Sequence, residues 1–423
     1  MRVWYSLYDR MLNKASLQAA FRKVKSADGS PGIDGQSCKD FAKDLDDNIE
    51  KLLRELREKT YRPHPVRRVE IEKPGGGIRL IGIPTVRDRV VQQRLKDIMD
   101  PIFDPEFHPS SYGYRPKRSC ADAVSKATAF MRTYEMKWVV DMDLSKCFDT
   151  LKHNHIIQMV KRRITDGSIL TMIGMFLKSG VMNSGNYEPT RTGSPQGGVI
   201  SPLLANIYLD EFDQFMKGRG HRIVRYADDI LIFKTSRSGA ENALEVATNF
   251  LEKHLKLKVN QQKTHITTLK DGVKYLGVEI RPSYTTIQRK KIKAFKKKVK
   301  AQTQRNSPVN LEKIIKELNL LLRGFANYFK MANCKNLFQK LMRWIRRRLR
   351  AIQLKLWKKP RKLHRRLRQL GYDGEFDFIK MTTWRNAACQ LSHWAMPNKW
   401  FSEMGLFEMD KVETGKLPPI TRG

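Results

Sequence analysis

The chain has few cysteines, few acidic residues and no long apolar segment. Its five cysteines are odd in number, far apart in the sequence and never spaced as Cys-x-x-Cys, so they favour reduced thiols with structural roles over a disulfide framework. No run of 18 apolar residues is present, and the first ten residues lack the apolar core of a signal peptide. We therefore expect an intracellular protein that does not contact a membrane.

The shortage of acidic residues leaves a large positive charge. There are 81 lysines and arginines against 43 aspartates and glutamates, a formal net charge of +38 in 423 residues. Such an excess is unusual for an enzyme of small metabolites, and it favours a polyphosphate partner. Much of it is concentrated in residues 289–372, where 28 lysines and arginines face only 2 acidic residues. Because nearly unrelieved positive charge repels itself, this region predicts a surface that binds a polyanion.

The charge and the hydrophobic pattern together divide the chain into four parts. Residues 1–60 predict a helical extension. Residues 61–285 alternate helices with short apolar strands, which indicates an α/β (α+β) domain. Residues 286–372 combine basic residues with apolar residues at helical spacing, so they predict a separate helical module. Residues 373–423 predict a small C-terminal extension that ends in a flexible tail, and its aromatic residues fit either a nucleic-acid contact or simple packing.

Two segments carry aspartates on predicted strands. Residues 138–144 resemble a buried strand, and the two-residue period of a strand places Asp141 and Asp143 on the same face. Asp228 and Asp229 lie between two short apolar runs, where a tight turn would place them at the tip of a hairpin. Buried carboxylates are unfavourable unless a cation neutralises them. Because hard divalent cations prefer oxygen ligands, the pattern predicts a two-metal site for phosphoryl transfer.

Further motifs accompany these aspartates in a fixed order. They include Gly193-Ser-Pro-Gln-Gly-Gly198, Arg225-Tyr-Ala-Asp-Asp229 and, in the basic module, Arg323-Gly-Phe-Ala-Asn-Tyr-Phe329. The series resembles that of the group II intron-encoded reverse transcriptase/maturase family over most of the chain. This resemblance implies a right-hand polymerase with fingers and palm in residues 61–285 and a helical thumb or maturase (X) domain in residues 286–372. The other matching segments are residues 31–35, 67–85, 111–116, 140–149, 201–206, 257–263, 275–277 and 344–349.

The resemblance implies the catalytic residues and the metal. The positions that match the family's carboxylates are Asp143, Asp228 and Asp229, which would hold two Mg²⁺ ions, with Mn²⁺ as a possible substitute. Asp141 faces the same way as Asp143, but Asp143 is the residue five positions before the aromatic Phe148 and is therefore the matching ligand.

Other matches imply contacts with the incoming dNTP, the primer and RNA. Lys73 and Arg79 flank a glycine-rich tip and would clamp the triphosphate, Phe148 would exclude a ribose 2′-hydroxyl, and Lys263 would lie near the phosphates. The resemblance assigns Gln196 and Gly197 to the floor of the incoming-nucleotide site, and Leu276 and Gly277 to the primer grip. The arginines expected to contact RNA are Arg343, Arg346, Arg347, Arg348 and Arg350.

The implied function is RNA-directed DNA synthesis combined with assistance to intron splicing and retromobility. The expected partners are an RNA template, a DNA or RNA primer, dNTPs and a group II intron RNA, in a prokaryotic cytoplasm or nucleoid rather than an organelle. After residue 372 only Cys389 and His393 could contribute to a zinc-binding endonuclease, so the compact class without that domain is expected.

Other interpretations stay open at this point. One is a splicing cofactor with little polymerase activity, against which the intact Asp143, Asp228 and Gln196 argue. Another is a domesticated relative that serves defence or DNA repair. A third, an RNA-templated RNA polymerase, would lack a gate such as Phe148. The oligomeric state also stays open.

Overall fold

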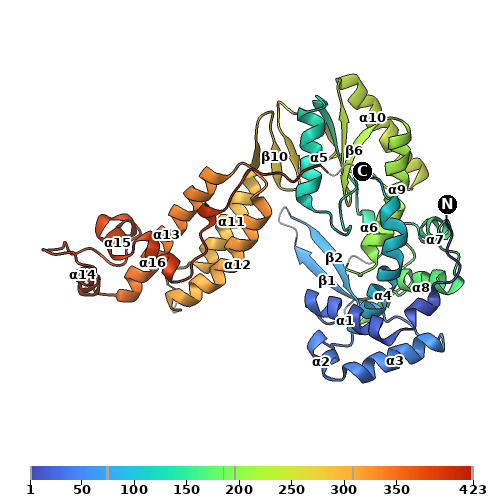
Figure 1. The fold of residues 1–423 in the computed structure, drawn as a ribbon, viewed down its shortest axis with the longest axis horizontal. Helices are drawn as coiled ribbons and strands as arrows, with labels where there is room; N and C mark the ends of the chain where they lie inside the picture. Colours follow the sequence, from blue (N-terminus) through green and yellow to red (C-terminus); the bar gives the residue numbers. More distant parts are fainter. Residues whose placement is uncertain (1, 73–75, 184, 195–196, 307–308, 421–423) are drawn as a thin grey trace. The chain divides into compact units, whose positions relative to one another are not determined.

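The computed structural model describes residues 2–72, 76–183, 185–194, 197–306 and 309–420. Its contacts divide the chain into two compact units, one formed by residues 2–268 with Ile420 and the other by Leu269–Pro419. Both units combine helices with a β-sheet (Figure 1), which confirms the predicted α+β class. Within the described residues, no helix is both long enough and apolar enough to cross a bilayer.

The first unit begins with a helical layer. Helix α1 packs against α3 and α4, and the apolar stripe of α3, for example Ile49 and Leu53, is buried in the core. Ser37 closes a capping box with Asp40 at the start of α2, which satisfies two backbone donors that a helix start otherwise leaves free. The elements of this layer are η1 (Tyr8–Met11), α1 (Lys14–Ala27), α2 (Cys38–Lys43), α3 (Leu45–Arg57), α4 (Val86–Phe103) and η2 (Asp104–Glu106).

A four-stranded sheet contains the predicted hairpin. Its order is β2-β1-β4-β5, with β1 antiparallel to β2 and parallel to β4. The observed bounds of the hairpin, β1 (Val66–Glu72) and β2 (Ile78–Ile83), coincide with the predicted strands on either side of the glycine tip. Strands β4 (Val181–Asn183) and β5 (Asn186–Glu188) complete the sheet.

A second four-stranded sheet, with the order β6-β7-β3-β8, carries the predicted aspartates. Strand β7 is central, and its Ile230–Phe233 segment is buried on both faces because helices cover the two sides of the sheet. On one face Phe130 of α5 packs against Phe233 with ring centroids 5.2 Å apart. On the other face α10 contacts β3 and β7. The strands are β3 (Trp138–Asp143), β6 (Arg222–Tyr226), β7 (Asp229–Lys234) and β8 (His265–Thr268).

Further helices surround this second sheet. Helix α9 runs beside β6 and also contacts α7 and α4, so it joins the sheet to the helical layer. The bounds are α5 (Cys120–Arg132), α6 (Cys147–Thr150), α7 (His153–Lys161), α8 (Gly167–Leu177), α9 (Ser201–Gly218), α10 (Arg237–Asn249) and the π-helical turn η3 (Phe250–His254).

The second unit joins a small sheet to a helical module. The strands β9 (Val273–Tyr275), β10 (Val278–Ile280) and β11 (Thr285–Ile287) pack with the helices that follow them: Gln288 donates to the Val278 carbonyl at 2.9 Å. The unit therefore starts before the boundary predicted at residue 286. Its helices are α11 (Arg289–Gln302), α12 (Leu311–Phe329), α13 (Lys335–Trp357), α14 (Pro360–Gln369), η4 (Asn386–Ala388), α15 (Gln390–Ala395), α16 (Asn398–Glu403) and η5 (Met409–Lys411).

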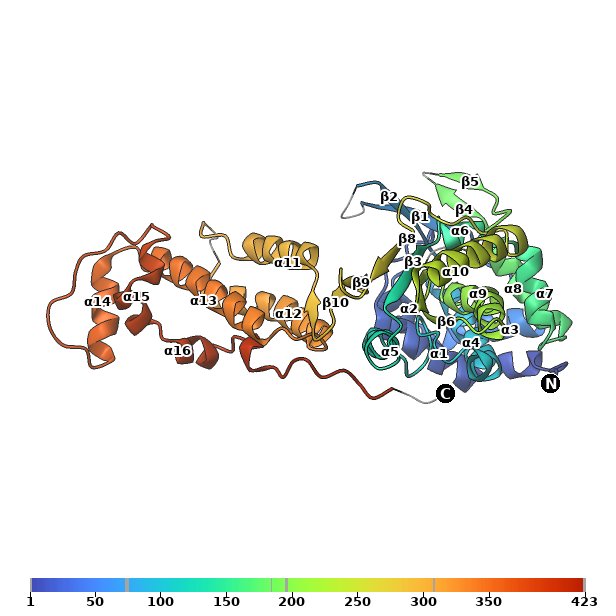
Figure 2. The ribbon, with the colours of Figure 1, turned by 90° about the horizontal axis from the view of Figure 1, so that it is seen from above.

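The segment after α16 is ordered against the helical module, contrary to the predicted flexible tail. Figure 2 shows it returning along α12 and α13, and η5 contacts both helices. The Asn319 side chain donates to the Gly405 carbonyl at 2.7 Å and accepts from the Phe407 N–H at 2.8 Å. Met409 is fully buried. Because these partners lie far apart in the sequence, local composition alone suggested a tail.

Candidate active site

The turn between β6 and β7 presents the Asp228–Asp229 pair. Tyr226 and Asp229 face each other in the ladder, so Ala227 and Asp228 form a two-residue hairpin turn. Ala227 has a φ of +58°, which two-residue hairpin turns require at their first position. Asp228 is therefore placed on the turn itself and Asp229 at the first position of β7, as the sequence predicted.

Strand β3 adds the third carboxylate beside this turn. Asp143 lies directly opposite Asp229 in the antiparallel register, whereas Asp141 lies opposite Leu231 on one side and His265 on the other. Side chains that face each other in this way have Cβ atoms about 4.5–5.5 Å apart, and like charges at that separation are destabilising. The register therefore brings Asp143 and Asp229 together at one end of the sheet and leaves Asp141 further from the turn.

The residues just before β8, the other neighbour of β3, hold Asp143. Lys263 Nζ and Asn260 Nδ2 each donate to Asp143 Oδ2 at 3.0 Å. The Asn260 backbone N–H donates to the Asp143 carbonyl at 2.8 Å, and the Asp143 N–H donates to Thr264 Oγ1 at 3.3 Å. Lys263 thus lies at the carboxylates, near the position the sequence predicted for it. Asn260 was not singled out, although it stands in the same matching segment.

Asp228 is half-buried beside these charges. Burial raises the pKa of its carboxyl group, the negative charge of Asp143 raises it further, and Arg79 and Lys263 oppose the shift. Arg79 itself is exposed on β2 opposite Ile71. The three predicted residues Arg79, Asp143 and Lys263 are therefore near enough to Asp228 to act on it electrostatically.

The raised pKa predicts an effect on stability without metal. A group of this kind stabilises the fold below its unfolded-state pKa and loses that contribution as pH rises through its folded-state pKa. Asp228→Asn cannot ionise, so it should melt at a higher temperature than the parent in EDTA at pH 7.5. The difference should shrink below the ordinary aspartate range, near pH 3.5. Thermal melts at the two pH values test this, and equal midpoints at pH 7.5 would contradict it.

Whether the three aspartates can hold a metal ion together depends on the position of the Asp143 carboxylate. Among the residues that the structure describes, no three His, Cys, Asp or Glu side chains converge closely enough to hold an ion, and Asp143 Oδ2 accepts hydrogen bonds from Lys263 and Asn260. The donor set nevertheless fits a hard divalent cation, since Asp143, Asp228 and Asp229 offer carboxylate oxygens from two adjacent strands and their turn.

Aromatic side chains line the approach to the carboxylates. Phe148 on α6 is half-buried, and its ring meets Tyr114 edge-on with centroids 6.3 Å apart. Burial raises the pKa of Tyr114, and the charge of Asp228 contributes to that shift. Tyr114 therefore belongs to the site although no role was predicted for it; its exposed fraction of 54% and its φ of +59° mark it as a residue held outward.

The loop before α9 packs against α6 and β2. The Ser194 N–H donates to the Phe148 carbonyl at 2.8 Å. Gly197 has a φ of +118°, and a Cβ there would meet the Gly82 carbonyl oxygen at 2.4 Å, so only glycine permits this approach. The other predicted members of the nucleotide site, Lys73 and Gln196, lie outside the described residues.

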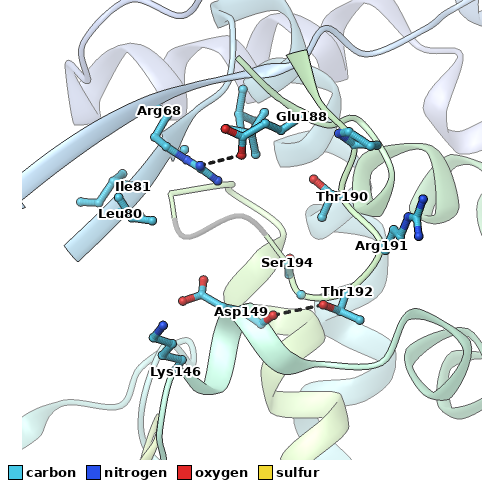
Figure 3. Close-up of a pocket in the computed structure, with 15 residues that line it drawn as sticks. Arg68, Leu80, Ile81, Lys146, Asp149, Glu188, Thr190, Arg191, Thr192 and Ser194 are labelled. Carbon is cyan, nitrogen blue, oxygen red and sulfur yellow. Dashed lines mark hydrogen bonds and ion pairs between the residues drawn. The ribbon is translucent and has the colours of Figure 1, made fainter. Parts of the chain in front are cut away.

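A cavity of about 450 Å³ opens between β1, β2, α6 and this loop (Figure 3). At one side Arg68 pairs with Glu188 at 2.7 Å, and at the other Thr192 donates to the Asp149 carbonyl at 3.5 Å. Its apolar lining includes Leu80, Ile81, Val66, Val181 and Pro189. The volume lies in the usual range for small-ligand sites, and the mixture of apolar, cationic and hydroxyl groups suits a nucleotide. No sequence motif predicts this cavity, because it forms where segments that are distant in the sequence meet.

The predicted primer grip belongs to the second unit. Leu276 and Gly277 form the turn between β9 and β10, with φ values of +45° and +85°. The Leu276 carbonyl accepts a hydrogen bond from Tyr328 Oη at 2.8 Å, and a Cβ on Gly277 would lie 3.4 Å from the Phe329 ring. The turn is thus fastened to α12.

The five arginines predicted to bind RNA divide into two groups on α13. Arg343 and Arg347 are exposed and stay candidates. Arg346 and Arg350 are buried: the first pairs with Asp410 at 2.9 Å, and the second donates to the Met396 carbonyl at 3.0 Å. Arg348 donates to Thr303 Oγ1 at 2.6 Å. These last three therefore hold the C-terminal segment and a neighbouring loop. The burial of Arg346 and Arg350 argues against their predicted contact with RNA, whereas the prediction for the half-buried Arg348 stays a prediction.

Comparison with known proteins gives two adjacent matches. Residues 71–280 match the reverse transcriptase (RNA-dependent DNA polymerase) family, and residues 292–371 match the maturase-specific domain of group II introns. The chain is 35% identical over 300 residues to protein YkfC of Escherichia coli (strain K12), which covers 62% of this chain and 79% of that protein. It is 28% identical over 445 residues to the group II intron-encoded protein LtrA of Lactococcus lactis subsp. cremoris, with 81% and 74% covered.

These matches and the geometry agree. The reverse transcriptase match begins near the end of β1 and includes the β6–β7 turn and Asp143, and the maturase match runs from within α11 past the end of α14. The chain is therefore an RNA-directed DNA polymerase, an activity that depends generally on divalent metal ions. It belongs to the group II intron-encoded reverse transcriptase/maturase family.

Proposed function

We propose that this enzyme transfers nucleotides from dNTPs onto a primer 3′-hydroxyl along an RNA template, with two Mg²⁺ ions at Asp143, Asp228 and Asp229. The observation that carries the proposal is the β3–β7 register, which sets Asp143 directly opposite Asp229 beside the Asp228 turn. Two facing carboxylates at the exposed end of a buried sheet are unfavourable alone. A bound pair of divalent cations would remove that conflict.

The chain's own residues divide the work around that centre. The metal ions, when bound, would lower the pKa of the primer hydroxyl and neutralise charge on the leaving pyrophosphate. Arg79 on the exposed strand β2 places a guanidinium toward the triphosphate. Lys263, which donates to Asp143 Oδ2, would supply a further positive charge near the phosphates. Phe148 closes the sugar side of the nucleotide site.

Primer extension on RNA tests the polymerase proposal. Purified protein with an RNA template, an annealed DNA primer and four dNTPs should extend the primer in Mg²⁺. Excess EDTA should stop synthesis, and a fresh excess of Mg²⁺ should restore it. Replacing the RNA template with a non-complementary RNA serves as the control. Failure of the Mg²⁺-loaded protein to extend any primer on RNA would contradict the proposal.

Phe148 should select deoxynucleotides over ribonucleotides. The ring lies beside Tyr114 at the entrance to the carboxylates, where a ribose 2′-hydroxyl would meet it. Phe148→Val removes that contact, so we expect the ratio of dNTP to rNTP incorporation efficiency to fall by roughly 10² or more, since a lost steric clash is worth a few kcal/mol. Steady-state kcat/KM for dCTP and CTP measures the ratio. An unchanged ratio in an active variant would remove the gate role.

We further propose that the second unit binds intron RNA and assists splicing. Every lysine and arginine of α11 is exposed, and the helix contains no acidic residue. Arg343 and Arg347 on α13 are exposed as well. If six or more of these cations reach phosphates, affinity for RNA should fall by roughly 10³-fold between 50 and 200 mM salt.

A splicing assay tests this second activity separately. The host intron RNA should splice faster with the protein than without it at near-physiological Mg²⁺. A variant with Arg343 and Arg347 both changed to glutamine should splice less efficiently while keeping its melting temperature. Splicing that is independent of the protein would contradict the maturase role and leave the polymerase role intact.

A further inference from the structure

A fully buried ion pair lies beneath the turn that carries Asp228. Arg225 on β6 and Asp213 on α9 are both 0% exposed. Arg225 Nη2 donates to Asp213 Oδ2 at 2.6 Å, and Nε lies 2.9 Å from each carboxylate oxygen. In the sequence, Arg225 is only the first residue of the motif Arg225-Tyr-Ala-Asp-Asp229, and no motif includes Asp213.

The other edge of the guanidinium reaches the turn. Arg225 Nη1 donates to the Ala227 carbonyl at 3.0 Å and to Asn206 Oδ1 at 2.9 Å. Asn206 lies seven residues before Asp213 on α9. Its Nδ2 donates to the Gly113 carbonyl at 2.8 Å. Arg225 therefore ties α9, the turn and the segment around Gly113 into one buried network.

The segment around Gly113 also touches the turn directly. A Cβ on Gly113 would lie 2.3 Å from the Ala227 backbone nitrogen, so the two backbones are in contact. The Tyr112 N–H donates to the Arg225 carbonyl at 2.9 Å, and the Arg225 N–H donates to the Ser110 carbonyl at 2.9 Å. Ala227, a residue with a β-carbon at positive φ, is thus held from below by Arg225 and from the side by Gly113. Backbone in a sparsely populated conformation persists when its surroundings fix it in this way.

Stability alone does not account for this arrangement. Apolar residues of similar volume often replace a buried ion pair with no loss of stability. A lysine could pair with Asp213 but could not also donate hydrogen bonds to Asn206 and to the Ala227 carbonyl. Only a guanidinium presents donors along two edges. The network is therefore suited to fixing the position of the turn.

We propose that Arg225, held by Asp213 and Asn206, is a positioning residue that sets the Ala227-Asp228 turn and thereby aims the Asp228 carboxylate. This inference rests on the proposed polymerase function, because aim matters only where Asp228 binds an ion. Positioning errors of about 1 Å at a reacting centre can lower rates by roughly 10²-fold.

The test separates positioning from folding. The double variant Arg225→Met, Asp213→Leu removes both charges and fills the space, and Arg225→Lys keeps the charge but loses the fork. Arg222→Lys on the same strand is the matched control, since Arg222 is exposed. The full-length proteins are compared by thermal melting, by Mn²⁺ titration followed by electron paramagnetic resonance, and by single-turnover primer extension on RNA.

We expect the double variant to melt near the parent temperature, to bind Mn²⁺ about tenfold more weakly and to extend primers roughly 10²-fold more slowly. A folded double variant with parental Mn²⁺ affinity and rate would overturn the proposal. If the double variant does not fold, Arg225→Lys decides in the same way: weaker Mn²⁺ binding supports positioning, and parental binding refutes it. Absence of extension by the parent and by Arg222→Lys would instead refute the polymerase function, while the Mn²⁺ affinities would still judge the role of Arg225.

Discussion

Asp143→Asn should lower the single-turnover rate of primer extension on RNA by at least roughly 10³-fold, whereas Asp141→Asn should lower it by less than about threefold. Both aspartates lie on β3 and face the same side of the sheet. Only Asp143 is opposite Asp229 in the register, and Asp141 is opposite Leu231. Because an amide is a weaker ligand than a carboxylate and carries no charge, the change at Asp143 removes a metal ligand while keeping the shape of the side chain.

Asp141→Asn serves as the control for Asp143→Asn. Both variants change one carboxylate to an amide on the same strand, so general effects on charge or on folding should be shared. Pre-bound primer–template, saturating dNTP and a titration of Mg²⁺ give the rate and the half-saturating concentration for each protein. Equal losses at the two positions would show that the register does not identify the metal ligand.

Arg346→Met should lower the thermal midpoint by about 4–8 °C, and Arg347→Met should leave it within about 1 °C. Arg346 is 5% exposed and its guanidinium pairs with Asp410 and Glu408 of the C-terminal segment. Its removal takes the ion-pair partner from Asp410, whereas Glu408 keeps its pair with Lys411. Breaking a fully buried pair costs about 3–5 kcal/mol, and about 2 kcal/mol is expected here because Asp410 is one-fifth exposed.

In RNA binding, Arg347→Met should have the larger effect and Arg346→Met the smaller one. Arg347 is exposed, so Arg347→Met should weaken RNA binding and reduce the slope of log affinity against log salt by about one. Arg346→Met, assayed well below its melting temperature, should leave that slope unchanged. Fluorescence melting and filter binding at several salt concentrations measure the two effects. A stable Arg346→Met protein with impaired RNA binding would restore the RNA-contact assignment that its burial argues against.

The parts of the site that the sequence predicted are those that depend on local pattern. The two-residue period of strand β3 placed Asp143 correctly, and the apolar runs around Asp228 predicted a hairpin tip because strand and turn preferences agree there. The glycine-rich tip between β1 and β2 fixed the hairpin bounds in the same way. In each case the deciding interactions lie within a few residues.

The parts that the sequence missed depend on long-range packing. Nothing local indicates that Asn319 binds the backbone near Gly405, or that Asp213 lies under the β6–β7 turn. The burial of two arginines on α13 follows a pattern that is visible in the sequence. Arg346 and Arg350 follow Met342 at intervals of four residues, along the buried stripe of that helix, and helical periodicity therefore indicated that they point inward.

In the proposed mechanism, Asp143, Asp228 and Asp229 hold the catalytic ions at the end of β3 and the start of β7. The most direct measurement is a crystal structure of the full chain with an RNA template, a chain-terminated primer, the matching dNTP and Mn²⁺, with anomalous scattering used to locate the metal. The proposal predicts two anomalous peaks roughly 3.5–4 Å apart among Asp143, Asp228 and Asp229, with Lys263 moved away from Asp143. Bound primer and nucleotide without Mn²⁺ at these three residues would contradict it.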